Sequence, residues 1–200
     1  MDKDKLIDVK QTFALWCALT AARSSPKCRF SNDEGAKIAT NDLLLKFRTL
    51  DDLPDPIKFD DCHRKLRQKI CLKAENIIED KTMHFTHGVA AKFINVYFKA
   101  MFLNDVPPEC IVQEMRINSL HPPIDRRLLK TLAKKKVGRL EKFWREKANK
   151  GWSNFSSDDY EDVIKHIKYV TKGHLWEIEE YWKIDDKDDK DDNNPKQRCL

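Results

Sequence analysis

The chain has 200 residues, of which 40% are apolar and 36% charged, and its formal net charge is +5. Such a length and apolar content can bury one core. The apolar run from Phe13 to Ala22 is too short to span a bilayer, and its flank mixes Asp and Lys, so we expect neither a membrane segment nor a secretory signal. The six cysteines include no Cys-x-x-Cys pair, which argues against a zinc knuckle, a redox pair or an iron–sulfur loop.

Charge is unevenly distributed along the chain. From Asp185 to Leu200 there are six Asp against three Lys and one Arg, so the first 184 residues carry +7. We therefore predict one compact domain over residues 1–184, which is the basic part, followed by an acidic, disordered tail over 185–200. The basic excess favours a polyanionic partner.

The pattern along the chain predicts an all-α fold, because only five glycines occur and alternating β-branched runs are absent. The first expected helix covers roughly 5–23, with Leu6, Val9, Phe13, Trp16 and Cys17 on one face, and we expect it to be a core helix. After a loop over 24–35, a second helix is expected over 36–48, ended by the breaker stretch 51–56.

The middle of the chain predicts two further helices. One, capped by Asp60 or Asp61, runs to about Glu79. After a turn over 81–88, residues 89–103 form the most apolar helix of the chain, which we expect to be central and buried. The Val106-Pro107-Pro108 break and an irregular segment then lead to Pro123-Ile124-Asp125, which opens a helix at Arg126.

The last third is strongly basic before it turns acidic. Residues 126–150 contain eleven Lys or Arg against two Glu, with apolar residues between them. Two more helices are expected over about 157–170 and 174–182, the first signalled by Ser156-Ser157-Asp158-Asp159.

Two short motifs carry a resemblance to a known family. The segments Gly88-Val89-Ala90-Ala91-Lys92 and Pro123-Ile124-Asp125 look like the hairpin and Pro-Val-Asp signatures of the helix-hairpin-helix DNA glycosylase superfamily. The closest likeness is to the eukaryotic and archaeal 8-oxoguanine glycosylases. The resemblance covers residues 62–132 and implies a helix-hairpin-helix glycosylase-like bundle.

The resemblance implies that Lys92 is a nucleophile and Asp125 its electrostatic and general-base partner. A Schiff base between Lys92 and the sugar would then allow strand cleavage as a second, lyase activity. The chemistry fits, since burial on an apolar helix lowers the pKa of an amine and a carboxylate stabilises positive charge developing on the sugar. Lys99, seven residues further on, is the reserve candidate.

The same reasoning predicts the DNA contacts. A base inside a duplex must be extruded before its sugar carbon can be attacked. The expected partner is double-stranded DNA containing a modified base, and no cofactor or metal is assigned. The expected DNA-binding residues lie at the hairpin and at the helix that follows Asp125: His87, Gly88, Val89, Arg126, Arg127 and Lys130. We expect a monomer in the cytoplasm or nucleoid.

The sequence leaves open two alternative functions and, for a glycosylase, the identity of the substrate. The chain could be a non-catalytic helix-hairpin-helix DNA-binding module, or a helical toxin-type ribonuclease that uses the Arg-x4-His pair Arg116 and His121. For a glycosylase, the modified base is either oxidised guanine, which implies DNA repair, or a bulky modified cytosine. Glucosylated hydroxymethylcytosine of phage DNA is an example of the latter and implies antiviral defence.

Overall fold

The computed structural model describes residues 2–25, 28–80, 82–103 and 110–182. Over these ranges the chain forms helices and connecting segments but no strand, which confirms the all-α prediction. None of these helices is both long and apolar enough to cross a membrane. The helices are α1 (Lys3–Ala22), α2 (Asn32–Ile38), α3 (Phe59–Ile77), α4 (His87–Phe98), α5 (Ile111–Ser119), α6 (Arg126–Lys134), α7 (Glu141–Lys150) and α8 (Ser157–Thr171).

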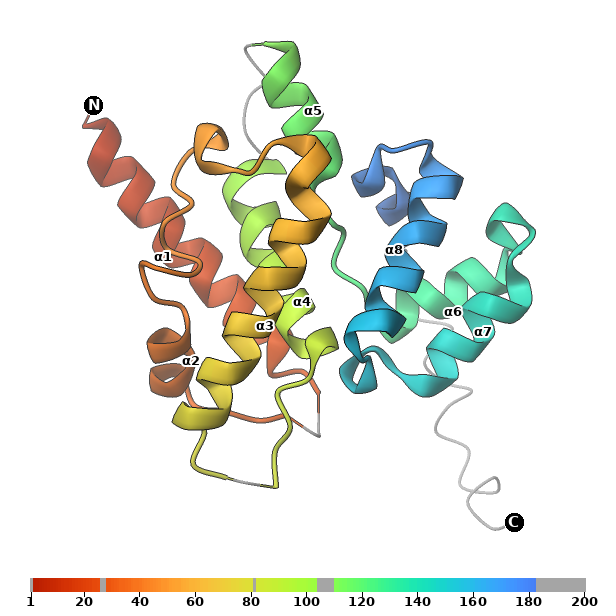
Figure 1. Ribbon diagram of the computed structural model, residues 1–200, viewed down its shortest axis with the longest axis horizontal. Coiled ribbons are helices and arrows are strands. Elements are labelled where there is room, and N and C mark those ends of the chain that lie inside the picture. The colour runs from red at the N-terminus through yellow and green to blue at the C-terminus, as the bar shows by residue number, and fades with distance from the viewer. Residues whose placement is uncertain (1, 26–27, 81, 104–109, 183–200) are drawn as a thin grey trace.

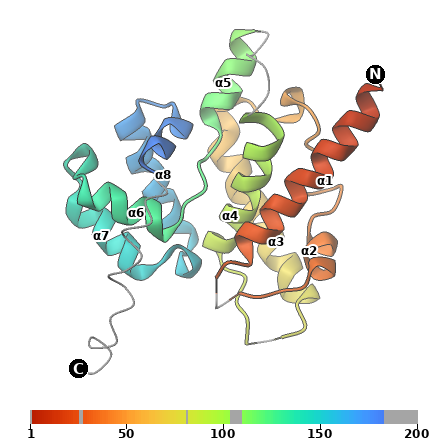
Figure 2. The same cartoon turned by 180° about the vertical axis from the view of Figure 1, so that it is seen from behind.

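The helices form two groups that meet at α4. On one side α4 packs against α1 and α3, and on the other against α8 and the short 3-10 segment η5 (Trp152–Asn154). The second group contains α6, α7, α8 and a longer 3-10 segment, η6 (Leu175–Tyr181). Figures 1 and 2 show α1 and α2 at one end of the molecule and α6 and α7 at the other. The acidic tail predicted over 185–200 lies outside the described residues.

Helix α1 presents a different face to the core from the one its apolar pattern predicts. Its buried face carries Ala14, Ala18 and Ala22, all fully buried, and packs against α4. The stripe that includes Phe13 and Trp16 is exposed instead, so the predicted core face is wrong. Small side chains allow the two helix backbones to approach closely, and bulky residues on that side would hold them apart.

The second predicted helix, over 36–48, is also wrong. Helix α2 covers Asn32–Ile38 instead, because Ser31 and Glu34 form a capping box that starts it within the predicted loop. The following residues form turns, yet Leu44 and Phe47 still reach the core. The helix is therefore shorter and earlier than predicted, and these two apolar residues lie outside it.

Helices α3 and α4 match the two helices predicted for the middle of the chain, but the predicted cap of α3 is wrong, because α3 begins at Phe59 and Asp60 and Asp61 lie inside its first turn. Helix α4 begins two residues earlier than predicted because Thr86 caps it, its hydroxyl accepting a hydrogen bond from the Val89 amide at 3.3 Å. All but two of its residues are buried. It ends at Phe98 in a π-helical turn, η3 (Lys99–Leu103), so the helix predicted over 89–103 changes its winding near its end.

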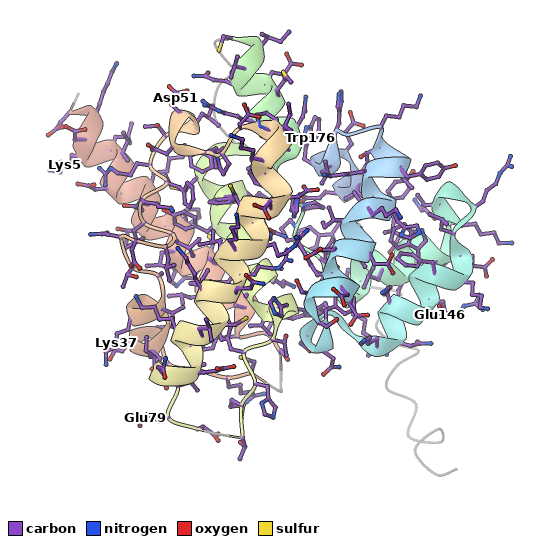
Figure 3. The ribbon with its side chains drawn as sticks, viewed as in Figure 1. Lys5, Lys37, Asp51, Glu79, Glu146 and Trp176 are labelled. Atoms are coloured by element: carbon purple, nitrogen blue, oxygen red, sulfur yellow. The ribbon has the colours of Figure 1, made fainter. Side chains whose placement is uncertain are left out.

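The segment before Asp125 contains a helix that the sequence did not predict. Helix α5 covers Ile111–Ser119 where an irregular stretch was expected, while the Val106-Pro107-Pro108 break lies outside the described residues. Trp176, labelled in Figure 3, donates a hydrogen bond from its indole nitrogen to Asn118 Oδ1 at 2.9 Å. This bond links α5 to η6, so the helix is joined to the second group.

The basic stretch 126–150 is divided into two helices. Helix α6 ends at Lys134, and Lys136 and Gly138 then adopt left-handed backbone conformations that turn the chain into α7. Helix α6 buries Leu128, Leu129 and Leu132 on one face, and so its basic residues gather on the other. Helix α6 packs against α7 and η6, and Asp125 at its cap lies beside Lys92 of α4.

Candidate active site

Lys92 lies in the second turn of α4, the most buried helix of the chain. Its side chain is 9% exposed, and its Nζ lies 3.6 Å from Oδ2 of Asp125. The ring of Trp152, from η5, covers the same ammonium at 4.5 Å from the ring centroid. The structure therefore brings together the two residues that the motifs single out, although 33 positions separate them in the chain.

Asp125 has two roles that do not compete for the same atom. As the N-cap of α6, it accepts a hydrogen bond from the Leu128 amide through Oδ1 at 2.8 Å. Its other oxygen, Oδ2, faces Lys92. Capping fixes the carboxylate in one orientation, which leaves a defined oxygen pointing at the amine.

Asn95, one turn after Lys92, ties α4 to the segment that leads to Asp125. Its side-chain amide donates to the backbone oxygen of Pro122 at 2.8 Å, and so it fixes the segment that leads to Asp125. Sequence reasoning missed Asn95, because a lone polar residue on an apolar helix gives no motif. It sets the separation between Lys92 and Asp125 without touching either of their charged groups.

Burial sets the protonation tendency of Lys92. Removal from water lowers the pKa of its ammonium below the ordinary value, and the Asp125 carboxylate opposes this shift only in part. A lowered pKa increases the fraction of free amine near neutral pH, which is the form that attacks a carbon centre.

A second lysine and carboxylate lie beside the first pair. Lys99, in η3, is ion-paired with Glu179 of η6, and its ammonium lies 5.4 Å from the ring centroid of Trp182. Burial raises the pKa of Glu179, pairing with Lys99 opposes the rise, and the negative charge of Asp125 adds to it. Glu179 therefore shares the electrostatic environment of Asp125. No sequence signal pointed to it.

The predicted hairpin contacts are placed at the junction of the two helix groups. Gly88 is buried, and its amide donates to the Phe155 oxygen at 3.2 Å, while the Val89 amide donates to Thr86. Phosphate binding at these two amides would therefore require their internal hydrogen bonds to open. His87 is half-buried and lines a cavity of about 580 Å³.

The predicted contacts on α6 are more accessible. Arg126 and Lys130 are exposed and Arg127 is half-buried, all within the first two turns after Asp125. The structure thus places three basic side chains next to the candidate site, on the helix that Asp125 caps.

No family model, curated protein or solved structure matches this chain. Its function is therefore inferred from its own residues.

The ribonuclease alternative required Arg116 and His121 to act together. Arg116 is ion-paired with Asp51 at 2.5 Å, whereas His121 is buried against Tyr160, whose hydroxyl lies 3.0 Å from its Nδ1. The two side chains are committed to different partners in different parts of the fold. Each of the two side chains therefore has its own partner in the structure, and the ribonuclease interpretation stays a prediction.

A buried polar network lies behind the candidate site. Asn95 joins His63 and Tyr160 at 2.8 Å each, and His121 continues the chain of bonds to Asp60 at 3.1 Å. Burial lowers the pKa of both histidines, and the donors and acceptors match when both rings are neutral with the proton on Nε2. Among the residues described, no group of three or more His, Cys, Asp or Glu side chains is arranged to hold a metal ion.

Proposed function

We propose that this chain is a DNA glycosylase that removes a modified base, with Lys92 as nucleophile and Asp125 as its partner. The observation that carries the proposal is the pair itself. A buried amine with a lowered pKa lies 3.6 Å from a carboxylate that is fixed at a helix cap. Surface ion pairs do not have these properties, whereas nucleophile sites commonly do.

The pair accounts for each step of base excision. The free amine of Lys92 attacks the sugar carbon C1′, and the bond from C1′ to the base breaks with its electron pair leaving on the base. Asp125 stabilises the positive charge that develops on the sugar and then accepts the proton released from Nζ. Ring opening gives a Schiff base between Lys92 and C1′, from which strand cleavage can follow.

The burial of Lys92 requires that the nucleotide leave the duplex. The amine lies under Trp152 with 9% of its side chain exposed, so a sugar inside a stacked helix cannot reach it. Extrusion of the nucleotide costs a few kcal/mol, which is lowest for damaged or weakly paired bases and so contributes to selectivity.

The DNA would be held next to the site by the basic start of α6. Arg126, Arg127 and Lys130 follow Asp125 directly, and phosphate contacts from such residues position a duplex without reading its sequence. His87, Gly88 and Val89 at the start of α4 are the proposed second contact, and their amides would bind phosphate only after the Gly88–Phe155 and Val89–Thr86 hydrogen bonds open. The +7 charge of residues 1–184 favours a polyanionic partner of this kind.

Two modified bases are proposed as the substrate: oxidised guanine, or a bulky modified cytosine such as glucosylated hydroxymethylcytosine. The first places the protein in DNA repair and the second in defence against phages with modified genomes. A panel of duplexes distinguishes them directly, because each carries a single modified base.

The test is borohydride trapping on duplexes that contain 8-oxoguanine, uracil, an alkylated base, an abasic site or glucosylated hydroxymethylcytosine. The proposal predicts a covalent adduct on one duplex that is lost in Lys92→Gln. Lys147→Gln is the matched control, because Lys147 is a similarly buried, ion-paired lysine on α7. Base release without an adduct would make water, activated by Asp125, the attacking group. Neither release nor adduct on any duplex would favour a non-catalytic DNA-binding module.

A further inference from the structure

A small charged cavity lies between α3 and α8, at the junction of the two helix groups. It has a volume of about 200 Å³, and six of the side chains that line it are charged: Asp60, Arg64, Arg67, Glu161, Lys165 and Lys168. Figure 1 shows α3 and α8 on either side of this junction. Sites for drug-sized ligands measure roughly 300–1,000 Å³, so an occupant of this cavity is small.

The cavity has an excess of positive charge. Four of its lining side chains are cationic and two are anionic, which leaves two positive charges without a carboxylate in the cavity. Arg67 is 1% exposed, yet its Nε has no hydrogen-bond partner among the described residues. Lys165 is exposed and forms no ion pair with the part of the chain that the structure describes. Buried positive charge that is only partly compensated favours an anion beside it.

The histidines next to the cavity are affected by the same positive charge. Burial is the main cause that lowers the pKa of His121, which also lines the cavity; Asp60 opposes this shift, and the charges of Lys168 and Arg67 add to it. The pKa of His63 is lowered by burial, by His121 and by Arg67. Both rings are therefore neutral, and the positive charge of the cavity is that of its Arg and Lys side chains.

Glu161 has one carboxylate oxygen that is available to a ligand. Its Oε1 accepts hydrogen bonds from Arg64 Nε at 2.7 Å, from Arg67 Nη2 at 2.8 Å and from Ser157 Oγ at 2.8 Å. Its Oε2 accepts none from the described residues, and the side chain is 34% exposed. This oxygen would repel a fully deprotonated anion such as sulfate. Hydrogen phosphate keeps one proton at neutral pH and can donate it to such an acceptor.

We propose that this cavity binds inorganic hydrogen phosphate, with Glu161 accepting a hydrogen bond from its P–OH group. The charge of the dianion matches the two excess positive charges, and Arg and Lys side chains are the usual donors to phosphate oxygens. Asp60 is not the acceptor, because its two oxygens are already bonded to His121 and Lys168. The phosphodiesters of DNA carry no P–OH group, so this site differs from the DNA contacts proposed above, and the inference does not rest on the proposed function.

Isothermal titration calorimetry of the full chain with sodium phosphate and with sodium sulfate tests the proposal. The titrations are made near neutral pH, with sodium chloride holding the ionic strength constant. We expect saturable binding of phosphate that is at least about tenfold tighter than binding of sulfate. Lys165→Gln should weaken phosphate binding roughly threefold or more, because it removes a nearby positive charge. Lys142→Gln, which removes the same charge from a 92% exposed position on α7, is the matched control and should bind phosphate like the wild type.

Glu161→Gln tests the role of the free oxygen. The amide oxygen would take the place of Oε1 beside the two arginines, which leaves the NH₂ group in the position of Oε2. This group donates a hydrogen bond where the carboxylate accepted one. We therefore expect sulfate to bind roughly tenfold tighter than it does to the wild type, and the preference for phosphate to be lost. Loss of both anions together with unchanged helix content would contradict this role.

Three other results would overturn the proposal. The wild type could show no saturable phosphate binding, or it could bind sulfate as tightly as phosphate. Lys142→Gln could weaken phosphate binding as much as Lys165→Gln, which would show an effect of net charge alone. An unmodified DNA duplex that displaced phosphate would assign the cavity to the nucleic-acid backbone instead. Circular dichroism checks the folding of each variant, and if Glu161→Gln does not fold, the wild-type preference for phosphate and the Lys165→Gln result still decide the outcome.

Discussion

Replacing Asn95 with alanine should destabilise the fold and separate the candidate catalytic pair. Asn95 is 1% exposed and makes three hydrogen bonds of 2.8 Å, to His63, Tyr160 and Pro122. Alanine removes all three. Tyr160 retains its contact with His121, but Nε2 of His63 and the Pro122 oxygen lose their partner. Each of these two orphaned buried groups costs about 1–3 kcal/mol, so the expected loss is about 2–6 kcal/mol.

Urea denaturation followed by circular dichroism measures this loss, and the same samples can be assayed for adduct yield. We expect the yield of Asn95→Ala to fall under conditions where the variant is still folded, because the segment before Asp125 is no longer tied to α4. Asn76→Ala is the control, since Asn76 is exposed and bonds only to its own helix, and it should change stability by less than about 0.5 kcal/mol. A loss below about 1 kcal/mol for Asn95→Ala would refute the reasoning.

Three further outcomes follow from the site. Gly88→Ala should destabilise the chain by at least about 1–3 kcal/mol in thermal unfolding, because its Cβ would lie 1.8 Å from the Trp152 backbone oxygen; an unchanged Tm would contradict the packing. Adduct formation should rise with pH and reach its half-maximum below pH 10.5, since burial lowers the pKa of Lys92. In Asp125→Asn the half-maximum should move to a still lower pH, because the carboxylate that raises this pKa is gone, and the maximum yield should fall. A half-maximum that moved to higher pH in this variant would contradict the pairing of Lys92 with Asp125. Lys130→Gln should reduce the salt dependence of DNA binding, measured by fluorescence anisotropy, by about one unit of the log–log slope, and an unchanged slope would exclude a phosphate contact there.

The class of the fold was predictable because it depends on properties summed over many residues. Few glycines and repeated three- and four-residue apolar spacing are enough to indicate helices. The core face of α1 was not predictable in the same way. Bulky residues and small residues form two stripes on that helix, and the sequence alone favours the more apolar one. Close packing of α1 on α4 selects Ala14, Ala18 and Ala22 instead.

The candidate site was predictable only where a local motif marked it. Lys92 and Asp125 each belong to a short signature, and the structure places them 3.6 Å apart. Glu179 and Asn95 have no such signature. Glu179 reaches the site from η6 through long-range packing, and Asn95 is one polar residue within an apolar helix. Their positions depend on how distant elements pack, which periodicity does not encode.

The most direct test of the central claim is to locate the covalent bond. Protein trapped by borohydride on its substrate duplex is digested, and the modified peptide is sequenced by mass spectrometry. The account predicts that the sugar remnant is attached to Lys92 and that Lys92→Gln leaves no modified peptide. Attachment to Lys99, or to any other lysine with Lys92 unmodified, would contradict the assignment of the nucleophile.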